Sequence, residues 1–311
     1  MSDHPPSFRR QHWLLEISLD RPVLVMLALY LLVWIIKILD TFIFRLDELI
    51  GEAILTKALG FVVVVAYVWT AGRRLRDIGF HRRHLSATLA TAVVGFGLVY
   101  VIAFTAQLAI LKASGEEARI VFSAVDPRTG LSGGLLFGLW LVAANLVNSA
   151  MEEALFRGVM LRHFLTRRTA WGAILLQAAL FSLWHLSWPL RRLIDGNALP
   201  GEVAFEAFGL TLSTLVSGVV YGYFTYRTDS LWGVFLAHVI NNSVFNVLFI
   251  STAAGTQSAL EFVPFASIFL IGHLLMIPVV GLVGNRIGLP EARPWGDVTG
   301  RVEPTATAIP P

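Results

Sequence analysis

Apolar stretches recur along almost the whole chain, and they constrain its fold more strongly than any other feature of the sequence. A helix needs about 20 mostly apolar residues to cross a bilayer. Eight stretches approach or exceed this length: residues 22–43, 53–71, 87–111, 133–164, 170–188, 205–226, 230–250 and 262–284. Only 14% of the 311 residues are charged, against about 25% in soluble proteins. We therefore predict an all-α, polytopic membrane protein, a bundle of about eight transmembrane helices.

The basic residues between these stretches predict how the bundle is oriented. Loops on the cytosolic side of a membrane carry an excess of Lys and Arg. The loops on one side contain many arginines: Arg9, Arg10, Arg21, Arg73, Arg74, Arg76, Arg82, Arg83, Arg162, Arg167, Arg168, Arg227, Arg286, Arg293 and Arg301. The loops on the other side contain fewer basic residues, diluted by acids: Arg45, Lys112, Arg119, Arg128, Arg191 and Arg192. We expect both termini to lie in the cytosol.

The same pattern divides the chain into five parts. Residues 1–21 are a cytosolic amphipathic segment with no sign of a removable signal peptide. Residues 22–130 hold the first three transmembrane helices, 131–250 hold helices four to seven, and 251–290 hold the eighth. Residues 291–311 are rich in Pro and Thr, which predicts a disordered tail.

Composition excludes several classes of protein. The chain has no Cys, so it has no disulfide framework, thiolate metal site or cysteine nucleophile. The calculated pI of 9.4 comes from loop arginines beside apolar spans, so we expect the lipid bilayer and not nucleic acid as the partner. An integral membrane protein is expected, in the plasma or inner membrane if the chain is bacterial.

Two glutamates and an arginine lie inside the fourth apolar stretch, in the sequence EEALFR. A carboxylate at bilayer depth costs about 2.5 to 3.5 kcal/mol on insertion scales, so such residues indicate function. Glu153 and Arg157 are spaced i, i+4, which predicts an ion pair with a supporting role. Glu152 points about 100° away and is left for chemistry. Asn148, one turn earlier, extends this polar face and is expected to line a water-filled cavity.

Polar residues on two later stretches are predicted to meet Glu152. If the hairpin turns near Thr169, Glu152 and His185 both lie about 16 residues from it, roughly 25 Å along their helices. His238 and Asn242 share one face of the seventh stretch. Glu152 and His185 suit activation of a water, and His238 and Asn242 suit stabilisation of an oxyanion. Asn241 competes with Asn242 for the second role.

Three motifs resemble one known family. EEALFR fits EExxxR, the segment from Phe181 to His185 fits FxxxH, and the segment from His238 to Asn242 fits HxxxN. Together they resemble the CPBP family of intramembrane proteases, which includes type II CAAX prenyl endopeptidases and bacterial Abi or bacteriocin-processing proteins. The resemblance covers the fourth to seventh stretches, so residues 131–250 become the expected catalytic core.

This resemblance implies an eight-helix fold whose cavity opens to the cytosol. It implies Glu152 as the base with His185, and His238 and Asn242 as oxyanion donors. Glu153, Arg157, Phe181 and Asn148 then become supporting residues. The implied substrate is a peptide or lipidated protein at the membrane, and one branch of the family implies a prenylated CaaX peptide.

Catalysis without a metal is the favoured interpretation, with no other cofactor expected. The family is often described as metalloproteases, and Glu152, His185 and His238 with a water would suit Zn²⁺. The sequence has no HExxH helix, the familiar zinc-protease signature.

Two non-proteolytic functions remain alternatives. The polar cluster would also suit a membrane scaffold or a bacteriocin-immunity protein, or a transporter in which Glu152 carries protons.

Overall fold

A computed structural model describes residues 6–126, 130–252 and 263–297, and helices dominate them. The first third contains α1 (Pro6–Asp20), α2 (Pro22–Ile38), η1 (Leu39–Phe44), α3 (Asp47–Ile50), α4 (Ile54–Thr70), η2 (Leu75–Ile78), α5 (Leu85–Thr91), η3 (Ala92–Phe96) and α6 (Gly97–Ala113). The remainder contains α7 (Leu135–Glu152), η4 (Glu153–Met160), α8 (Leu161–Leu165), α9 (Ala170–Trp184), α10 (Ser187–Ile194), α11 (Pro200–Thr228), α12 (Trp232–Val247) and α13 (Val263–Ile287). All eight predicted apolar stretches are therefore helical over most of their length.

Six helices of the described chain are long and apolar enough to cross a membrane: Pro22–Phe44, Leu85–Ala113, Leu135–Leu165, Ala170–Ile194, Pro200–Thr228 and Pro264–Ile287. The second expected span, α4, is apolar but shorter, with 17 residues. The seventh, α12, has 16 residues. The structure is thus a polytopic helical membrane protein, and the predicted count of eight exceeds the six that meet this length.

Four short strands depart from the all-α prediction. β1 (Arg119–Phe122) pairs antiparallel with β4 (Leu248–Ser251), with Arg119 opposite Ser251. β2 (Ala124–Val125) pairs with β3 (Ser132–Gly133). The expected seventh span, 230–250, was wrong at its end, because residues 248–250 extend into β4. Aromatic and β-branched residues favour a strand once a partner strand is available.

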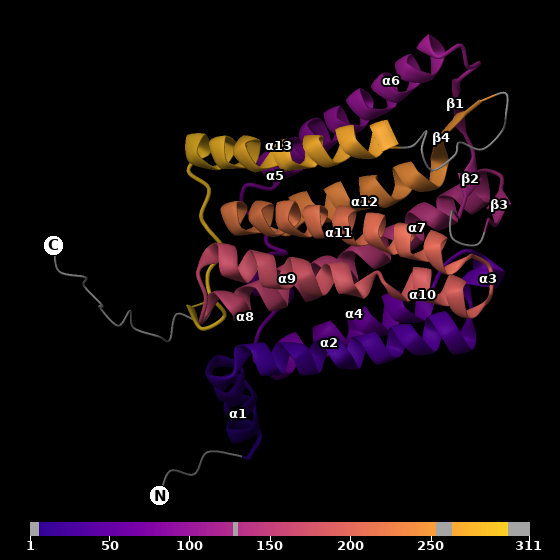
Figure 1. The fold of residues 1–311 in the computed structure, drawn as a ribbon. Coiled ribbons are helices and arrows are strands. Elements are labelled where there is room, and N and C mark those ends of the chain that lie inside the picture. Colours follow the sequence, from indigo (N-terminus) through magenta and orange to yellow (C-terminus); the bar gives the residue numbers. More distant parts are fainter. Residues whose placement is uncertain (1–5, 127–129, 253–262, 298–311) are drawn as a thin grey trace, which may run out of the picture.

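The two ends of the bundle hold different elements. Figure 1 shows α1 and the turn between α8 and α9 at one end, and α3, α10 and the strands at the other. The last described residues return to the first end, where Trp295 is fully buried and stacks on His163 with 4.2 Å between ring centroids. Residues 291–297 are therefore packed, and the predicted disordered tail was wrong for them. Residues 298–311 lie outside the described chain.

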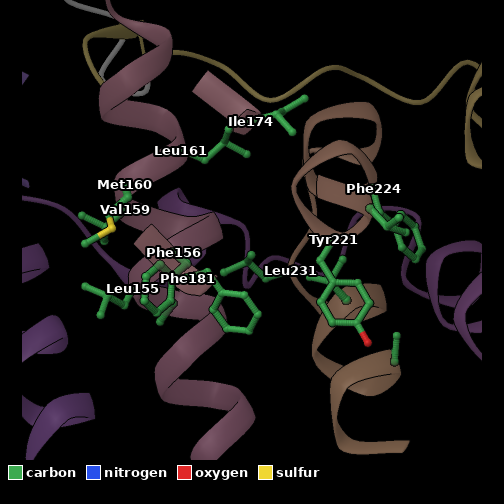
Figure 2. Packing of buried hydrophobic residues seen from close by; sticks show 14 of the residues in the cluster. Leu155, Phe156, Val159, Met160, Leu161, Ile174, Phe181, Tyr221, Phe224 and Leu231 are labelled. Atoms are coloured by element: carbon green, nitrogen blue, oxygen red, sulfur yellow. The ribbon is translucent and has the colours of Figure 1, made fainter. Parts of the chain in front are cut away.

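The core lies around η4, in the middle of the bundle. Phe156 and Phe181, which lie beside each other in Figure 2, meet edge to face. Their ring centroids are 5.1 Å apart. Beside them, α9 and α11 approach closely at Gly218, where an added Cβ would lie 2.9 Å from the Cα of Ala178. Small residues at such crossings allow helices in membranes to pack backbone to backbone. This packing brings the fourth, fifth and sixth apolar stretches together.

Candidate active site

The EEALFR motif occurs where an α-helix becomes a π-helix. Glu152 is the last residue of α7, and Glu153 begins the π-helical segment η4. Glu152 is only 4% exposed and Glu153 is fully buried. π-Helical turns are rare and occur frequently at functional sites, because the wider turn changes where side chains point. Both carboxylates therefore point into the protein interior.

Glu153 joins an arginine and a histidine. Its Oε1 lies 3.1 Å from Nη1 of Arg157, as the i, i+4 spacing predicted. The same oxygen lies 2.7 Å from Nδ1 of His238, which comes from α12. The predicted ion pair is confirmed, and it includes a third member that the spacing did not indicate.

Aromatic rings enclose the guanidinium of Arg157. Its Cζ lies 4.0 Å from the centroid of the Phe181 ring and 5.4 Å from that of Tyr221. A guanidinium over an aromatic face gains cation–π stabilisation, which increases when the group is desolvated. Phe181 therefore links the EExxxR and FxxxH motifs through its ring, which explains its supporting position.

Glu152 has a different set of contacts from its neighbour. Its Oε1 accepts a hydrogen bond of 3.0 Å from Nε1 of Trp184, on α9. Its Oε2 has no hydrogen-bond partner among the described residues and lies 3.5 Å from Nε2 of His238. A buried oxygen without a partner is costly unless water or a ligand supplies one. One oxygen of Glu152 is thus held in place while the other is available.

His185 follows the last residue of α9, where the helix ends. Its Nδ1 lies 2.8 Å from the backbone oxygen of Phe181, so this nitrogen donates. In the neutral ring, Nε2 then carries the lone pair and can accept a proton or a hydrogen bond. The ring also meets Phe181 edge to face with 4.8 Å between centroids. Phe181 therefore orients His185 through both its backbone and its ring.

A large cavity contains most of the predicted site residues. Its volume is about 980 Å³, and its lining includes Glu152, His185, Asn148 and Asn242. Asn148 occupies the position expected from its spacing to Glu152. His238 is not among the lining residues of the described chain, although it contacts both glutamates. The structure thus brings the four predicted catalytic residues into one region, with His238 behind the cavity wall.

The choice between the two asparagines is decided by their partners. Asn241 accepts a 2.5 Å hydrogen bond from the hydroxyl of Tyr100 on α6. Asn241 also donates to Oδ1 of Asn242 at 3.1 Å. That bond occupies the oxygen of Asn242 and leaves its NH₂ group as the available donor. Asn242 lines the cavity, whereas Asn241 is not among its lining residues.

Lys37 is a site residue that the sequence motifs did not indicate. It comes from α2, is 4% exposed and lines the same cavity. Its Nζ donates to the backbone oxygen of Trp184 at 2.6 Å and lies 4.3 Å from the centroid of that indole. Trp184 in turn holds Glu152. The available signal was a lysine inside an apolar span, which by itself indicates a functional position.

The side chains do not fit a zinc site as they stand. Within the part of the chain that the structure describes, no group of three or more His, Asp or Glu is arranged to hold a metal ion. His238 uses Nδ1 on Glu153, so only its Nε2 can approach Glu152. Glu152 and His238 supply two donors, and His185 would have to bring its Nε2 to the same ion to complete the three protein ligands of catalytic zinc.

One comparison with known proteins identifies this region. Residues 134–244 match the family described as type II CAAX prenyl endopeptidase Rce1-like. No curated protein and no solved structure matches the chain. The matched segment runs from just before α7 into α12, so it contains all three motifs of the site.

Proposed function

We propose that this chain, whose residues 134–244 match the type II CAAX prenyl endopeptidase Rce1-like family, is an endopeptidase in which Glu152 activates a water against a peptide bond. The observation that carries this proposal is the cavity, because Glu152, His185 and Asn242 all line it. A hydrolase inside a membrane needs such a water-filled space, since water is a reactant. The substrate is a polypeptide segment held at the membrane.

The first step is addition of water to the peptide carbonyl. A water bound between Glu152 and Nε2 of His185 meets two acceptors, which turns its lone pairs toward the substrate carbon. Glu152 takes the proton as the new C–O bond forms, and the carbonyl oxygen becomes an oxyanion. The bond from Trp184 fixes one oxygen of Glu152 at 3.0 Å, so the other is positioned for this transfer.

The second step is collapse of the tetrahedral intermediate. The NH₂ group of Asn242 donates to the oxyanion while it exists. The C–N bond then breaks, and the proton held by Glu152 passes to the leaving amine, with His185 available to relay it. The products are a carboxylic acid and an amine, so no oxidant, reductant or metal is consumed.

His238 has a less direct role than the sequence motifs implied. Its Nδ1 donates to Glu153, so its Nε2 can donate to an oxyanion only when the ring carries two protons. Its position 3.5 Å from Oε2 of Glu152 fits a residue that positions the base. We assign Asn242 as the direct oxyanion donor and His238 as the link between Glu152 and the Glu153–Arg157 pair.

The decisive variant is Glu152→Gln, which keeps the shape of the side chain and removes its basicity. We expect cleavage of a membrane-associated reporter peptide to fall at least about 100-fold, the lower range for loss of a general base. Purified protein in detergent provides the assay, with mass spectrometry of the products. Glu117→Gln, a change of the same chemistry at an exposed position, is the matched control.

Two outcomes would contradict this role for Glu152. Retained cleavage in Glu152→Gln, with normal folding, would remove it as the base. If liposomes that contain the unmodified protein took up a solute together with protons, and no peptide were cleaved, the protein would instead be a transporter.

A chelator tests whether a metal takes part. Because the described donors do not form a three-ligand group, we expect full cleavage after dialysis against a zinc chelator and no zinc by elemental analysis. Loss of cleavage that added zinc restores would overturn the metal-free mechanism.

A further inference from the structure

Among the described residues, the lining of the cavity extends from the middle of the bundle toward one of its ends. At its inner end are Glu152 and His185, and toward the other end the lining residues belong to α3, the loop before β3, α10 and the start of α11. The outer residues are Asp47, Glu48, Asp126, Gly130, Leu131, Arg191, Arg192, Asp195, Asn197 and Glu206. In Figure 1, α3 and α10 lie at the end opposite to α1 and the α8–α9 turn. No residue of α1 or of the α8–α9 turn is among the lining residues of the described chain.

The folded chain places most of its basic residues at the end without the cavity mouth. This end includes α1, the segment between α4 and α5, the α8–α9 turn, the α11–α12 turn and the residues after α13. The basic residues of these segments within the described chain are Arg9, Arg10, Arg21, Arg73, Arg74, Arg76, Arg82, Arg83, Arg162, Arg167, Arg168, Arg227, Arg286 and Arg293. Within the described chain, the mouth end has fewer basic residues: Arg45, Lys57, Lys112, Arg119, Arg191 and Arg192. Short loops rich in Arg stay in the cytosol during insertion.

These two observations are incompatible with one pair of expectations from the sequence. Cytosolic termini and a cavity that opens to the cytosol cannot both hold, because the termini side and the mouth lie at opposite ends. The charge distribution decides in favour of the termini, since reversing the protein would move the Arg-rich loops across the membrane. Acidic residues at the mouth do not affect this choice, because Asp and Glu contribute little to orientation.

We propose that the cavity opens to the extracytoplasmic face, and that the substrate is a membrane-tethered polypeptide segment presented on that face. The proposal rests on the proteolytic function above and names the side from which its substrate comes. A prenylated C terminus made in the cytosol does not reach this mouth. Glu152 is then approached from outside, along the part of the cavity lined by residues of α3, α10 and the start of α11.

Single cysteines test the orientation directly, because the natural chain contains none. Asn197→Cys places a thiol at the exposed mouth, and Asn148→Cys places one on the cavity wall near Glu152. Asp20→Cys is the control at the opposite end, where that side chain is 79% exposed. Each full-length variant is treated with a membrane-impermeant maleimide in sealed vesicles of known sidedness, and then in detergent to count all thiols.

The expected pattern is distinct for the two ends. In right-side-out vesicles, Asn197→Cys and Asn148→Cys should react and Asp20→Cys should not, whereas inside-out vesicles should give the reverse. The opposite pattern overturns the proposal. Reaction of one variant from both sides also overturns it, because the chain would then have mixed orientation. Protection of the Asn197→Cys and Asn148→Cys thiols on both sides overturns it as well, since no aqueous mouth would exist.

A cleavage assay separates this inference from the proposed function. A hydrophobically anchored reporter peptide is added to the outside of each type of vesicle carrying the unmodified protein. Cleavage only with right-side-out vesicles supports both proposals. Cleavage only with inside-out vesicles keeps the protease and overturns the orientation. No cleavage with the expected labelling pattern keeps the orientation and counts against the protease.

Discussion

Glu152 and Glu153 are adjacent, yet the folded chain assigns them different tasks. Glu153 is bound by Arg157 and His238, so both its neighbours stabilise its charge. Glu152 is held through one oxygen and keeps the other free of hydrogen bonds within the described chain. Oε2 of Glu153 also has no hydrogen-bond partner among the described residues, so an unpaired oxygen is common to both carboxylates. The two differ in that Glu152 lines the cavity, whereas Glu153 is not among its lining residues. Access to the cavity is therefore what distinguishes Glu152 chemically.

Lys37 acts on Glu152 through Trp184, and this gives a test at a position outside the family match. Lys37→Met keeps the length of the side chain and removes the charge and the 2.6 Å bond to the Trp184 backbone. We expect kcat to fall about tenfold, equivalent to about 1.4 kcal/mol in the barrier, with KM nearly unchanged. Peptide cleavage under steady-state conditions measures both constants.

Two further variants make this prediction specific. Lys37→Arg retains the positive charge and should recover part of kcat, whereas a merely apolar packing role would not distinguish Arg from Met in this way. Lys112→Met, at an exposed position, should leave both constants unchanged. An increase in KM alone for Lys37→Met would assign the residue to substrate binding instead of positioning.

The π-helical segment η4 and the crossing of α9 with α11 are the elements that build the site. A regular α-helix repeats every 3.6 residues, whereas a π-helix has a wider turn. Gly218 and Gly222 of α11 face Ala178 and Gln177 of α9, so the two backbones lie close together. The nitrogen Nε2 of Gln177 uses this proximity to donate to the backbone oxygen of Gly218 at 2.7 Å. This crossing sets where Phe181 and His185 lie relative to η4.

Gly218→Ala tests the crossing. The added Cβ would lie 2.9 Å from the Cα and Cβ of Ala178, so one helix must shift. We expect a loss of about 1 to 3 kcal/mol in the free energy of unfolding, as for other overpacked interiors. Gly209→Ala, on the same helix, meets nothing within 4 Å and should be neutral or slightly stabilising. Unfolding in mild detergent measures both; equal effects would show that helix propensity, not contact, governs Gly218.

An ion-pair network ties distant parts of the chain together around the cavity mouth. Arg45, which follows η1, lies 2.7 Å from Asp195, which follows α10. Arg191 of α10 lies 2.7 Å from Asp47 of α3, and it also bonds Glu48. These pairs join the first apolar hairpin to the end of the fifth stretch. The shape of the mouth therefore depends on charges that are far apart in the sequence.

The network predicts a dependence of stability on pH. Hydrogen bonding from Arg45 holds the pKa of Asp195 below its ordinary value of 3.8. A carboxyl group whose pKa is lower in the folded state stabilises the fold above its unfolded pKa, and this contribution disappears as the pH falls through the folded value. Asp195→Asn should therefore lower the thermal midpoint at pH 7, and the difference from the natural protein should shrink as the pH falls below the ordinary value of 3.8.

Differential scanning fluorimetry at both pH values gives this comparison. The expected difference at pH 7 is small, because pairs near a surface contribute about 0 to 1 kcal/mol. A difference that persists unchanged at the lower pH would mean that Asp195 stabilises the mouth by packing, not by charge.

Local sequence patterns were sufficient to predict the helices and the pairing of Glu153 with Arg157. Hydropathy over about 20 residues reports whether a segment can leave water, so the eight apolar stretches could be located without knowing their partners. The i, i+4 spacing alone predicted the pair of Glu153 with Arg157, which the structure confirms. Motifs on three stretches predicted the family whose model matches residues 134–244.

Only the tertiary structure decided the long-range contacts. The sequence by itself determined which segments are apolar and which polar residues interrupt them, because both properties are local. The bond between Trp184 and Lys37, the turn of Asn242 toward the cavity, the packing of Trp295 and the end at which the cavity opens all join residues from different helices. Such contacts depend on how helices cross and rotate, which is set by close packing between side chains and not by periodicity within one helix.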